Sequence, residues 1–278
     1  MSKRTNQIFD KAIKRILGLS HPAVVDLFNG LFDKNFPLNS RVTYHETETV
    51  SDTGRTIADP IINLTAPEER GKNTLGEKNA SGGTFHVEAQ IKKDNTIIIR
   101  VFRYDFEEAV KGKTEDTQND TIVLKFPQPK VIYLGNYGDT PDELKLRLDF
   151  GTQGSFTYRV PALKLLDFSV QQLVERHMVL LLPLYLLKYR EEMKKNPTKE
   201  TAGKLRQLIE ADILKAFDES LRAGTITPED ARALLALLDR LYNYIYGDYE
   251  ILRQEGVYEM IADRLVLATD IAEARGKK

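Results

Sequence analysis

Two carboxylates and an amide are the residues of this 278-residue chain whose types and spacing best suit chemistry. Asp59 and Glu88 lie on neighbouring stretches with the alternating pattern of β-strands, and Gln90 shares the face of Glu88. A hairpin joining these strands would bring both carboxylates to one magnesium ion, which binds carboxylate oxygens and keeps several waters. Such an ion polarises phosphoryl oxygens and activates water, and Gln90 would orient the water or contact a phosphate. The pattern therefore predicts phosphodiester hydrolysis.

The strand at residues 85–91 must position Glu88 and Gln90. Its residues alternate between an apolar face and a face that carries His86, Glu88 and Gln90. Polar groups on a buried strand cost folding free energy unless they are paired or bind a ligand. Each residue also has a plainer interpretation: Glu88 faces solvent, His86 is structural or lies at the surface, and Asp59 ends a strand or caps a turn.

Periodicity predicts the elements around this strand, with helical spacing at both ends of the chain and β-type alternation between them. We expect helices at residues 8–17 and 20–35, strands at 41–50 and 56–64, and a helix from Asp94 or Asn95 to about 111. Residues 66–83 and 113–120 are polar and predict exposed connections. Short strands are expected at 121–125, 131–134, 144–148 and 155–160. Pro60 predicts an edge position or a bulge.

From residue 169 onward the period is helical, which predicts two domains, residues 1–168 and 169–278. Helices are expected at residues 178–192, 199–221, 228–246 and 250–275. The clearest helix start is Thr227 as the cap, followed by Pro228 and two acidic residues. The leucine-rich face of residues 234–245 predicts either a helical core or the surface of a homodimer.

The composition limits the classes of function. The formal net charge is −1, so contact with DNA would depend on local basic groups. There is no cysteine, which excludes disulfides, thiolate metal sites and cysteine nucleophiles. The longest apolar run, residues 178–187, is about half of the ~20 residues that a membrane span needs. We expect a cytoplasmic protein without membrane contact.

Several short motifs, in this order along the chain, resemble the PD-(D/E)XK nuclease superfamily, specifically its bacterial branch of recombination-promoting nucleases and nuclease-family transposases. The motifs are Asp10-x-x-Ile13-Lys14, Thr47-Glu48, Arg55-Thr-Ile-Ala-Asp59, His86-Val-Glu88-Ala-Gln90, Arg100-x-x-x-Tyr104 and Leu181-Leu-Pro-Leu-Tyr-Leu-Leu-Lys188. The resemblance covers roughly residues 8 to 192.

The resemblance implies an α/β fold of the restriction-endonuclease type, a mixed sheet flanked by helices. Asp59 and Glu88 would be the ligands of Mg²⁺, for which Mn²⁺ is a possible substitute. Glu48 resembles a glutamate on the first strand of that branch and is a further catalytic candidate. Gln90 stands where the superfamily usually has lysine, and it resembles what this branch often has.

Three residues after the strand are candidates for binding DNA. Arg100 and Tyr104 lie four residues apart and therefore share one helix face, which the resemblance turns toward the site. The alternative is that Arg100 packs against the ring of Tyr104. Lys92 is a candidate phosphate contact or an ordinary solvated corner.

These observations favour a magnesium-dependent DNA endonuclease of the mobile-element-associated, recombination-promoting kind. The alternative is a catalytically inactive protein of the same fold that acts as a DNA-binding or protein-interaction module. The missing lysine and the near-neutral charge favour this alternative. A phosphoesterase acting on a small molecule is less favoured, because the chain lacks histidine clusters.

Overall fold

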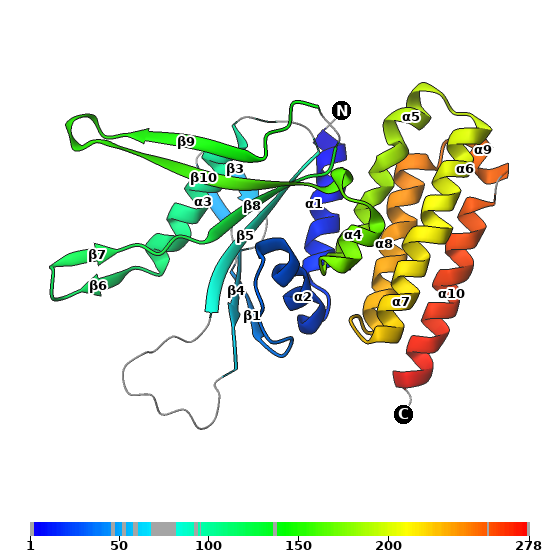
Figure 1. Ribbon diagram of the computed structural model, residues 1–278, viewed down its shortest axis with the longest axis horizontal. Helices are drawn as coiled ribbons and strands as arrows, with labels where there is room; N and C mark the ends of the chain where they lie inside the picture. Colours follow the sequence, from blue (N-terminus) through cyan, green and yellow to red (C-terminus); the bar gives the residue numbers. More distant parts are fainter. Residues whose placement is uncertain are drawn as a thin grey trace. The chain divides into compact units, whose positions relative to one another are not determined.

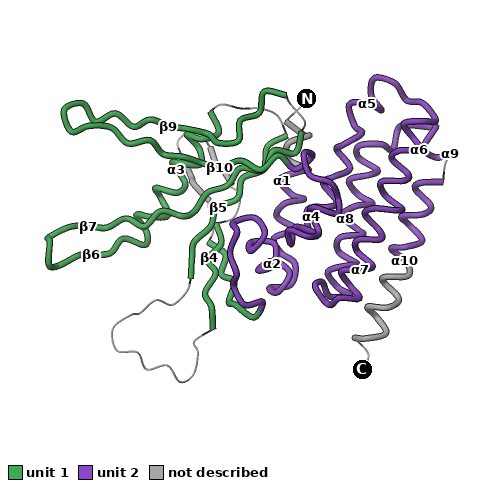
Figure 2. Tube along the Cα trace, viewed as in Figure 1, with its two compact units in different colours: residues 1–6, 39–164 green, residues 7–38, 165–278 purple. Residues whose placement is uncertain are grey.

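The chain folds into two compact units. The computed structural model describes residues 3–45, 48–51, 54–57, 61–67, 82–91, 94, 96–135, 138–254 and 256–276 (Figure 1). Unit 1 comprises residues 1–6 and 39–164, and unit 2 comprises residues 7–38 and 165–278 (Figure 2). The sequence predicted one boundary, between residues 168 and 169. The units instead divide after residue 164, and residues 7–38 group with the carboxy-terminal helices.

Unit 1 is built on a six-stranded mixed sheet. In spatial order the strands are β1 (Arg41–His45), β4 (Ile61–Thr65), β5 (Gly82–Gln90), β8 (Gln128–Tyr133), β10 (Ser155–Lys164) and β9 (Glu143–Asp149). β1, β4 and β5 pair antiparallel, whereas β8 runs parallel to both β5 and β10. A parallel pair needs a crossover, which here contains helix α3 (Ile97–Lys111). The mixed α/β class predicted from the sequence is confirmed.

Helix α3 covers one face of this sheet. Its Ile97, Ile98 and Val101 form a buried cluster with side chains of β8, β9 and β10, including Val131 and Val160. The predicted helix ended at about residue 111, as α3 does. Asp94 lies at its start, where it accepts hydrogen bonds from the hydroxyl and the amide of Thr96 (2.6 and 2.8 Å).

Two small hairpins stand outside the six-stranded sheet. One pairs β2 (Glu48–Ser51) with β3 (Gly54–Ile57), and the other pairs β6 (Thr114–Asp116) with β7 (Thr121–Val123). The predicted strands at 41–50 and 56–64 are therefore each divided in two. The predicted polar loop at 113–120 contains β6, which periodicity missed because backbone pairing rather than an apolar face holds so short a hairpin.

Pro60 lies outside the described residues, but the strand that follows it is not at an edge. β4 begins at Ile61 and lies between β1 and β5. Of the two alternatives that Pro60 predicted, the edge position is wrong for β4, because antiparallel partners flank it on both sides. The other alternative, a bulge at Pro60, falls outside the described residues.

Unit 2 is helical. Its elements are α1 (Lys3–Leu17), whose first residues belong to unit 1, α2 (His21–Phe32), η2 (Leu165–Asp167), α4 (Val170–Glu175), η3 (Val179–Tyr189), α5 (Arg190–Lys195), α6 (Lys199–Gln207), η4 (Leu208–Leu214), α7 (Lys215–Ala223), α8 (Pro228–Tyr246), α9 (Glu250–Gln254) and α10 (Val257–Gly276). The amphipathic α1 and α2 group with these helices because their apolar faces are buried there. The ring of Phe9 lies edge-on to that of Tyr244, for example.

Three predicted helices of unit 2 differ in detail from the structure. The helix predicted at 199–221 contains a π-helical segment, η4. Residues 179–189 form a 3₁₀ helix that contains Pro183, which has no backbone N–H to donate. The predicted helix at 250–275 is broken at Gly256, whose positive φ of 64° lies in the left-handed region. No helix within the described ranges is both long and apolar enough to cross a membrane.

Helix α8 begins where the sequence predicted. Thr227 and Asp230 form a reciprocal capping box, with Pro228 in the first turn. The leucines of α8 are buried in unit 2, which answers the question of core or interface for these side chains: they form core. A homodimer therefore stays a prediction that these leucines do not support.

Candidate functional site

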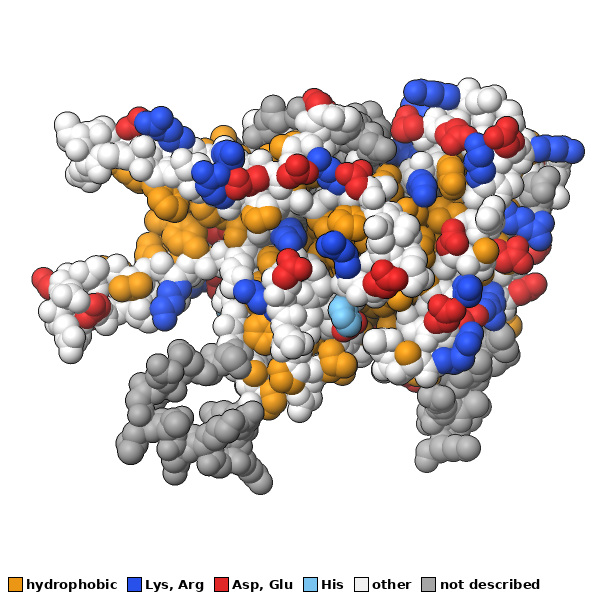
Figure 3. Space-filling view, viewed as in Figure 1, with side chains coloured by type: hydrophobic (Ala, Val, Ile, Leu, Met, Phe, Trp, Pro, Cys, Tyr) orange, Lys and Arg blue, Asp and Glu red, His pale blue; other side chains and the backbone are white. Residues whose placement is uncertain are grey.

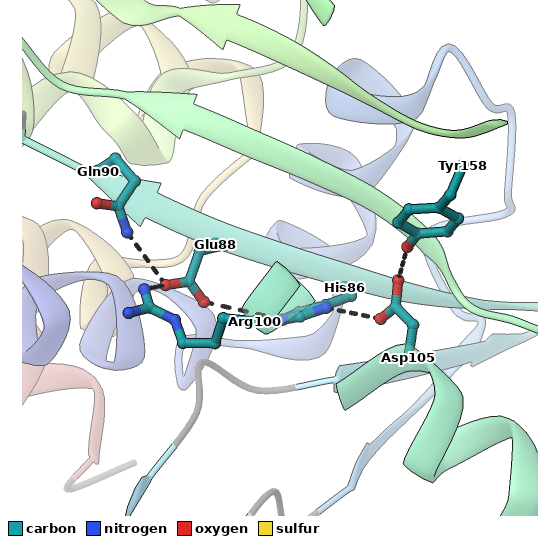
Figure 4. A network of polar contacts seen from close by, with 6 residues as sticks. All are labelled: His86, Glu88, Gln90, Arg100, Asp105 and Tyr158. Atoms are coloured by element: carbon teal, nitrogen blue, oxygen red, sulfur yellow. Dashed lines mark hydrogen bonds and ion pairs between the residues drawn. The ribbon is translucent and has the colours of Figure 1, made fainter. Parts of the chain in front are cut away.

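A row of polar side chains runs along β5 on the face that α3 covers. His86, Glu88 and Gln90 alternate with apolar residues, so all three point to this face (Figure 4). Glu88 is only 4% exposed, and His86 is completely buried. Buried charges are rare unless they are paired, so the partners of Glu88 decide what the row can do.

Glu88 has a different partner on each carboxylate oxygen. The guanidinium of Arg100 donates to Oε1 from α3, and the side-chain amide of Gln90 donates to the same oxygen at 3.2 Å. Oε2 lies 3.9 Å from Nε2 of His86. The side chain of Arg100 is 41% exposed, so it closes the row on the solvent side and neutralises the carboxylate.

Beyond His86 the contacts continue to Asp105 on α3, which is completely buried. Nδ1 of His86 lies 2.7 Å from Oδ1 of Asp105, and the hydroxyl of Tyr158 donates to Oδ2 of Asp105. Burial, and then the charge and the hydrogen bond of Asp105, raise the pKa of Tyr158 far above its usual value. Five side chains therefore form one line, from Arg100 through Glu88, His86 and Asp105 to Tyr158 (Figure 4).

The position of Arg100 follows from the start of α3. The hydroxyl and the amide of Thr96 lower the pKa of Asp94, with a smaller contribution from the charge of Arg100. The ionised Asp94 favours the helix start at neutral pH, because a carboxylate there accepts hydrogen bonds from otherwise unpaired donors. Arg100 lies one turn further along α3, where its guanidinium donates a hydrogen bond to Glu88.

Tyr104 does not reach the surface. It is 2% exposed, and its ring lies edge-on to that of His86, with 6.3 Å between the ring centroids. The arginine that covers this ring is Arg103 and not Arg100 (4.8 Å). The predicted contact of Tyr104 with nucleic acid is therefore incompatible with its place in the core, and the prediction of an Arg100–Tyr104 stack named the wrong arginine.

Three predicted residues cannot be placed in the site. Asp59 and Lys92 lie outside the described residues. Glu48 begins β2, whose partner is β3 and not a strand of the six-stranded sheet, and its side chain is outside the described part of the chain. The structure thus brings together Glu88, Gln90 and Arg100 of the predicted set.

Sequence reasoning missed Asp105 and Tyr158 and gave His86 no partner. A signal for Asp105 existed, because it shares the buried side of α3 with Ile98 and Val101, where a charged residue needs a partner. Tyr158 lies 53 residues further along the chain than Asp105, and no local pattern connects the two.

A second pair of a histidine and a carboxylate lies at the far end of α3. Nδ1 of His45 on β1 is 2.5 Å from Oε1 of Glu108, whose other oxygen is 3.4 Å from Nζ of Lys111. This pair resembles the His86–Asp105 pair chemically, but it does not belong to the β5 row. It therefore offers a control for experiments on His86.

The surface of unit 1 between the β6–β7 and β9–β10 hairpins is mainly hydrophobic (Figure 3). Near it, the rings of Phe102, Phe106 and Phe126 stack or tilt against one another within 6.4 Å. Because this cluster contains no charge that would attract phosphate, it is not a candidate for contacts with the DNA backbone.

The donors of the row suit a cation, although the described residues do not complete a site. No group of three or more histidine, aspartate or glutamate side chains in the described ranges could hold a metal ion. His86 and Glu88 supply two donors at 3.9 Å, one imidazole nitrogen and one carboxylate oxygen. Both are ordinary ligands of divalent metals, so the row fits a metal in donor chemistry.

Comparison of the chain with protein-family models, with curated proteins and with solved structures found no match. Architecture and site therefore define the class: a mixed α/β unit with a buried polar row on a central strand, accompanied by a helical unit.

Proposed function

We propose that the chain is a metal-dependent endonuclease that hydrolyses DNA phosphodiester bonds, with a restriction-endonuclease-like core and of the recombination-promoting kind. The observation that carries this proposal is Glu88, a buried carboxylate on the central strand β5 with Gln90 beside it and Arg100 opposite. Burying a charged group costs folding free energy unless the group is paired or binds a ligand.

The order of elements in unit 1 supports the proposal. An antiparallel meander of β1, β4 and β5 is followed by α3 and then by β8, parallel to β5. The resemblance to the nuclease superfamily implies a mixed sheet flanked by helices, in which three strands are followed by a helix. Glu88 falls on the third strand of this meander.

The role of Asp59 rests on the pairing of two strands. Ile61 of β4 is the partner of His86 on β5, and the strands run antiparallel. Asp59 itself lies outside the described residues, two positions before β4 begins. Its part as the second carboxylate is therefore proposed from the sequence, where it precedes the strand that pairs with β5.

Each residue has a distinct part in the proposed reaction. Glu88 and Asp59 would hold Mg²⁺ or Mn²⁺, and the ion would polarise the phosphoryl oxygen and activate water. The amide of Gln90 would orient the attacking water. Arg100 would bind the phosphate, for which its fork of donors is suited. Lys92 remains a candidate phosphate contact, whereas Glu48 and Tyr104 receive no role.

The test is cleavage of supercoiled plasmid by the full chain in Mg²⁺ or Mn²⁺, followed on agarose gels. Glu88→Gln keeps the size and removes the charge, so we expect it to lower the rate at least ~100-fold, as loss of a metal ligand does. Asp59→Asn should act in the same direction, and His45→Gln should leave the rate unchanged. Equal cleavage by wild type and Glu88→Gln, or none by either, contradicts the proposal.

A specific observation favours a second candidate, a catalytically inactive module of the same fold. Arg100 already neutralises Glu88, so the carboxylate is satisfied without a metal. An inactive module would bind DNA in a salt-dependent manner that survives Glu88→Gln, or would bind no DNA, and it would not cleave the plasmid. Fluorescence anisotropy with a labelled duplex distinguishes these outcomes.

A further inference from the structure

A cavity of about 380 Å³ lies in unit 2, where the end of α8 meets α9 and α10 (Figure 1). Its volume is within the range of sites that hold small organic molecules. The side chains that give it its chemistry are four tyrosines and two opposite charges, namely Tyr242, Tyr246, Tyr249, Tyr258, Arg253 and Glu259. The proposed nuclease site uses none of these residues, so this cavity is a separate candidate for binding.

Three of the tyrosine rings follow one another along the wall of the cavity. The ring centroids of Tyr242 and Tyr246 are 5.8 Å apart, and those of Tyr246 and Tyr249 are 6.4 Å apart, with interplanar angles of 45° and 54°. Because the rings are inclined to one another and not stacked flat, they curve around the space that they line. The hydroxyl of Tyr246 donates to the carbonyl of Leu186 (2.5 Å), which holds the middle ring in place.

The aromatic wall runs from the surface into the core of unit 2. Tyr258 is 44% exposed, whereas Tyr242 and Tyr246 are 2% and 1% exposed. A ligand that enters beside Tyr258 therefore loses its water against the inner rings. Attraction between a cation and the face of an aromatic ring is strongest where both are shielded from water. The wall thus favours a positively charged group at the inner end of the cavity.

Two opposite charges line the cavity without pairing with one another. Arg253 donates to the carboxylate of Glu250 (3.3 Å) and to the carbonyl of Gly247 (3.1 Å), and three of its five N–H donors remain for a ligand. Glu259 makes no ion pair within the described part of the chain. Burial and then the charge of Glu259 raise the pKa of Tyr242 to about 12, while the charge of Arg253 lowers it. The phenol is therefore neutral at physiological pH, and both charges act on the same inner ring.

These features favour a ligand that carries both signs of charge. A simple cation is attracted by the rings and by Glu259 but repelled by Arg253, and a simple anion meets the reverse. A zwitterion satisfies both charges. A quaternary ammonium suits the aromatic wall better than a primary one, because it has no N–H donors that would stay unpaired against the rings.

We propose that this cavity binds a small zwitterion of the betaine class, with its quaternary ammonium against the tyrosine rings near Glu259 and its carboxylate on Arg253. The residues of the site all belong to unit 2, whereas Glu88 belongs to unit 1. Binding is therefore measured without any cleavage assay, and each proposal stands or fails by itself.

The first experiment compares ligands by calorimetry on the full chain. Glycine betaine is matched by tert-butylacetate, which has the same shape and carboxylate but a neutral carbon in place of the charged nitrogen. We expect glycine betaine to bind at least ~10-fold more tightly than tert-butylacetate, because the rings attract the positive charge. Glycine, which has a primary ammonium, should also bind more weakly. No binding of glycine betaine, or equal binding of either control ligand, overturns the proposal.

NMR of the ligand reports whether it lies against the rings. Protons over the face of an aromatic ring are shielded, so the methyl signal of glycine betaine should move upfield when the protein is added. An unshifted methyl signal in a sample where calorimetry detects binding would place the ligand away from the tyrosines and contradict the proposal.

Variants assign the parts of the site. Tyr249→Leu and Glu259→Gln should each weaken binding of glycine betaine by ~3–10-fold, as loss of one partner of a cation does. Asp263→Asn is the control, because Asp263 is an exposed carboxylate on α10 that does not line the cavity. Arg253→Met should weaken glycine betaine but not tetramethylammonium, which has no carboxylate. Equal losses in Glu259→Gln and Asp263→Asn would overturn the proposed site. The comparison of ligands on the wild type decides the matter even where a variant does not fold.

Discussion

Arg100 competes with any cation for Glu88, because its guanidinium already binds Oε1 of that carboxylate. Arg100→Met keeps much of the apolar stem and removes the charge. We expect Mn²⁺ to bind this variant about 10-fold more tightly, equivalent to ~1.4 kcal/mol. Calorimetry measures the effect. Arg103→Met is the control, because Arg103 lies over the ring of Tyr104 and does not contact Glu88. Unchanged or weaker binding in Arg100→Met argues against a metal at this position.

Ionisation of Tyr158 makes the free energy of unfolding depend on pH in the alkaline range. Its pKa is raised in the folded protein above the model value of 10.0, first by burial and then by Asp105. A raised pKa means that the folded state holds the proton more tightly, so this stabilisation is complete below pH 10 and is lost as the pH rises above it.

Tyr158→Phe tests this dependence. At pH 8 the variant should be less stable by ~1–3 kcal/mol, because Asp105 loses a buried hydrogen-bond donor. Phenylalanine does not titrate, so the stability of the variant should fall less steeply between pH 9.5 and 11. Urea unfolding at a series of pH values measures both quantities. Parallel curves for the two proteins would show that Tyr158 does not contribute to the pH dependence.

The sequence predicted which side chains share a face of β5 better than it predicted their partners on other elements. Glu88 and Gln90 share a strand face by simple alternation, and Arg100 follows them on the next element. Asp105 and Tyr158 could not be derived in the same way, because their contact joins a helix to a strand far away in the sequence. Tyr104 shows the opposite error: its spacing from Arg100 was correct, but spacing does not tell which helix face is buried.

At the scale of elements, α2 depends on the absence of a side chain at Gly30. A Cβ there would lie 1.9 Å from the backbone oxygen of Arg176, which is far inside van der Waals contact. Gly30→Ala should destabilise the protein by at least ~2 kcal/mol, because backbone has to move. In α6, Gly203 has open space around its Cβ position. Gly203→Ala should stabilise the protein by ~0.5–1 kcal/mol, since alanine favours helix.

Thermal and urea unfolding of these two glycine variants provide the measurement, and each serves as the control of the other. The signs should be opposite although the substitution is the same. A Gly30→Ala protein as stable as wild type would mean that α2 and the segment at Arg176 are further apart than the structure has them.

Asp230 fixes the start of α8 through more than its own cap. Its carboxylate accepts hydrogen bonds from the amide and hydroxyl of Thr227 (3.0 and 2.9 Å) and from those of Ser20 (2.9 and 2.6 Å). Asp230→Ala removes four hydrogen bonds to a buried charge, so we expect a loss of ~2–4 kcal/mol. Asp239→Ala, on the same helix, removes a single exposed acceptor and should change the stability by less than ~0.5 kcal/mol. Urea unfolding compares them, and equal effects would contradict the role of Asp230.

Elements with a strong local signal were predictable from the sequence. Helix α8 begins at its Thr227–Pro228 signal, and α3 follows its apolar period. The strands at 41–50 and 56–64 were predicted as continuous because alternation persists across a break in pairing. The 3₁₀ geometry of η3 was not predicted, because a long apolar run alone predicts an ordinary helix.

At the scale of the whole molecule, charge nearly cancels, with 40 basic and 41 acidic residues. Any DNA binding must therefore come from a few local contacts such as Arg100 and not from a general attraction. Each phosphate contact adds about −0.9 to the slope of log affinity against log salt. We expect a slope shallower than about −4, measured by anisotropy over a range of salt concentrations. A slope near −10 would indicate an extended basic surface.

The division into two units was only partly accessible from the sequence. The change to helical period near residue 169 lies close to the observed division after residue 164. The grouping of residues 7–38 with the carboxy-terminal helices depends on contacts between segments far apart in the sequence. Periodicity shows that α1 and α2 have an apolar face, but it does not show which part of the chain covers that face.

The line of side chains from Arg100 to Tyr158 also implies an order of folding. Glu88 and Arg100 are separated by 12 residues, and His86 and Asp105 by 19, whereas Tyr158 is 53 residues from Asp105. Contacts between residues close in sequence require less loop closure and form earlier. We therefore expect β5 and α3 to pack together first, and the contact of Asp105 with Tyr158 of β10 to form later. During synthesis, the charged centre of the site would assemble before the strand that seals it has left the ribosome.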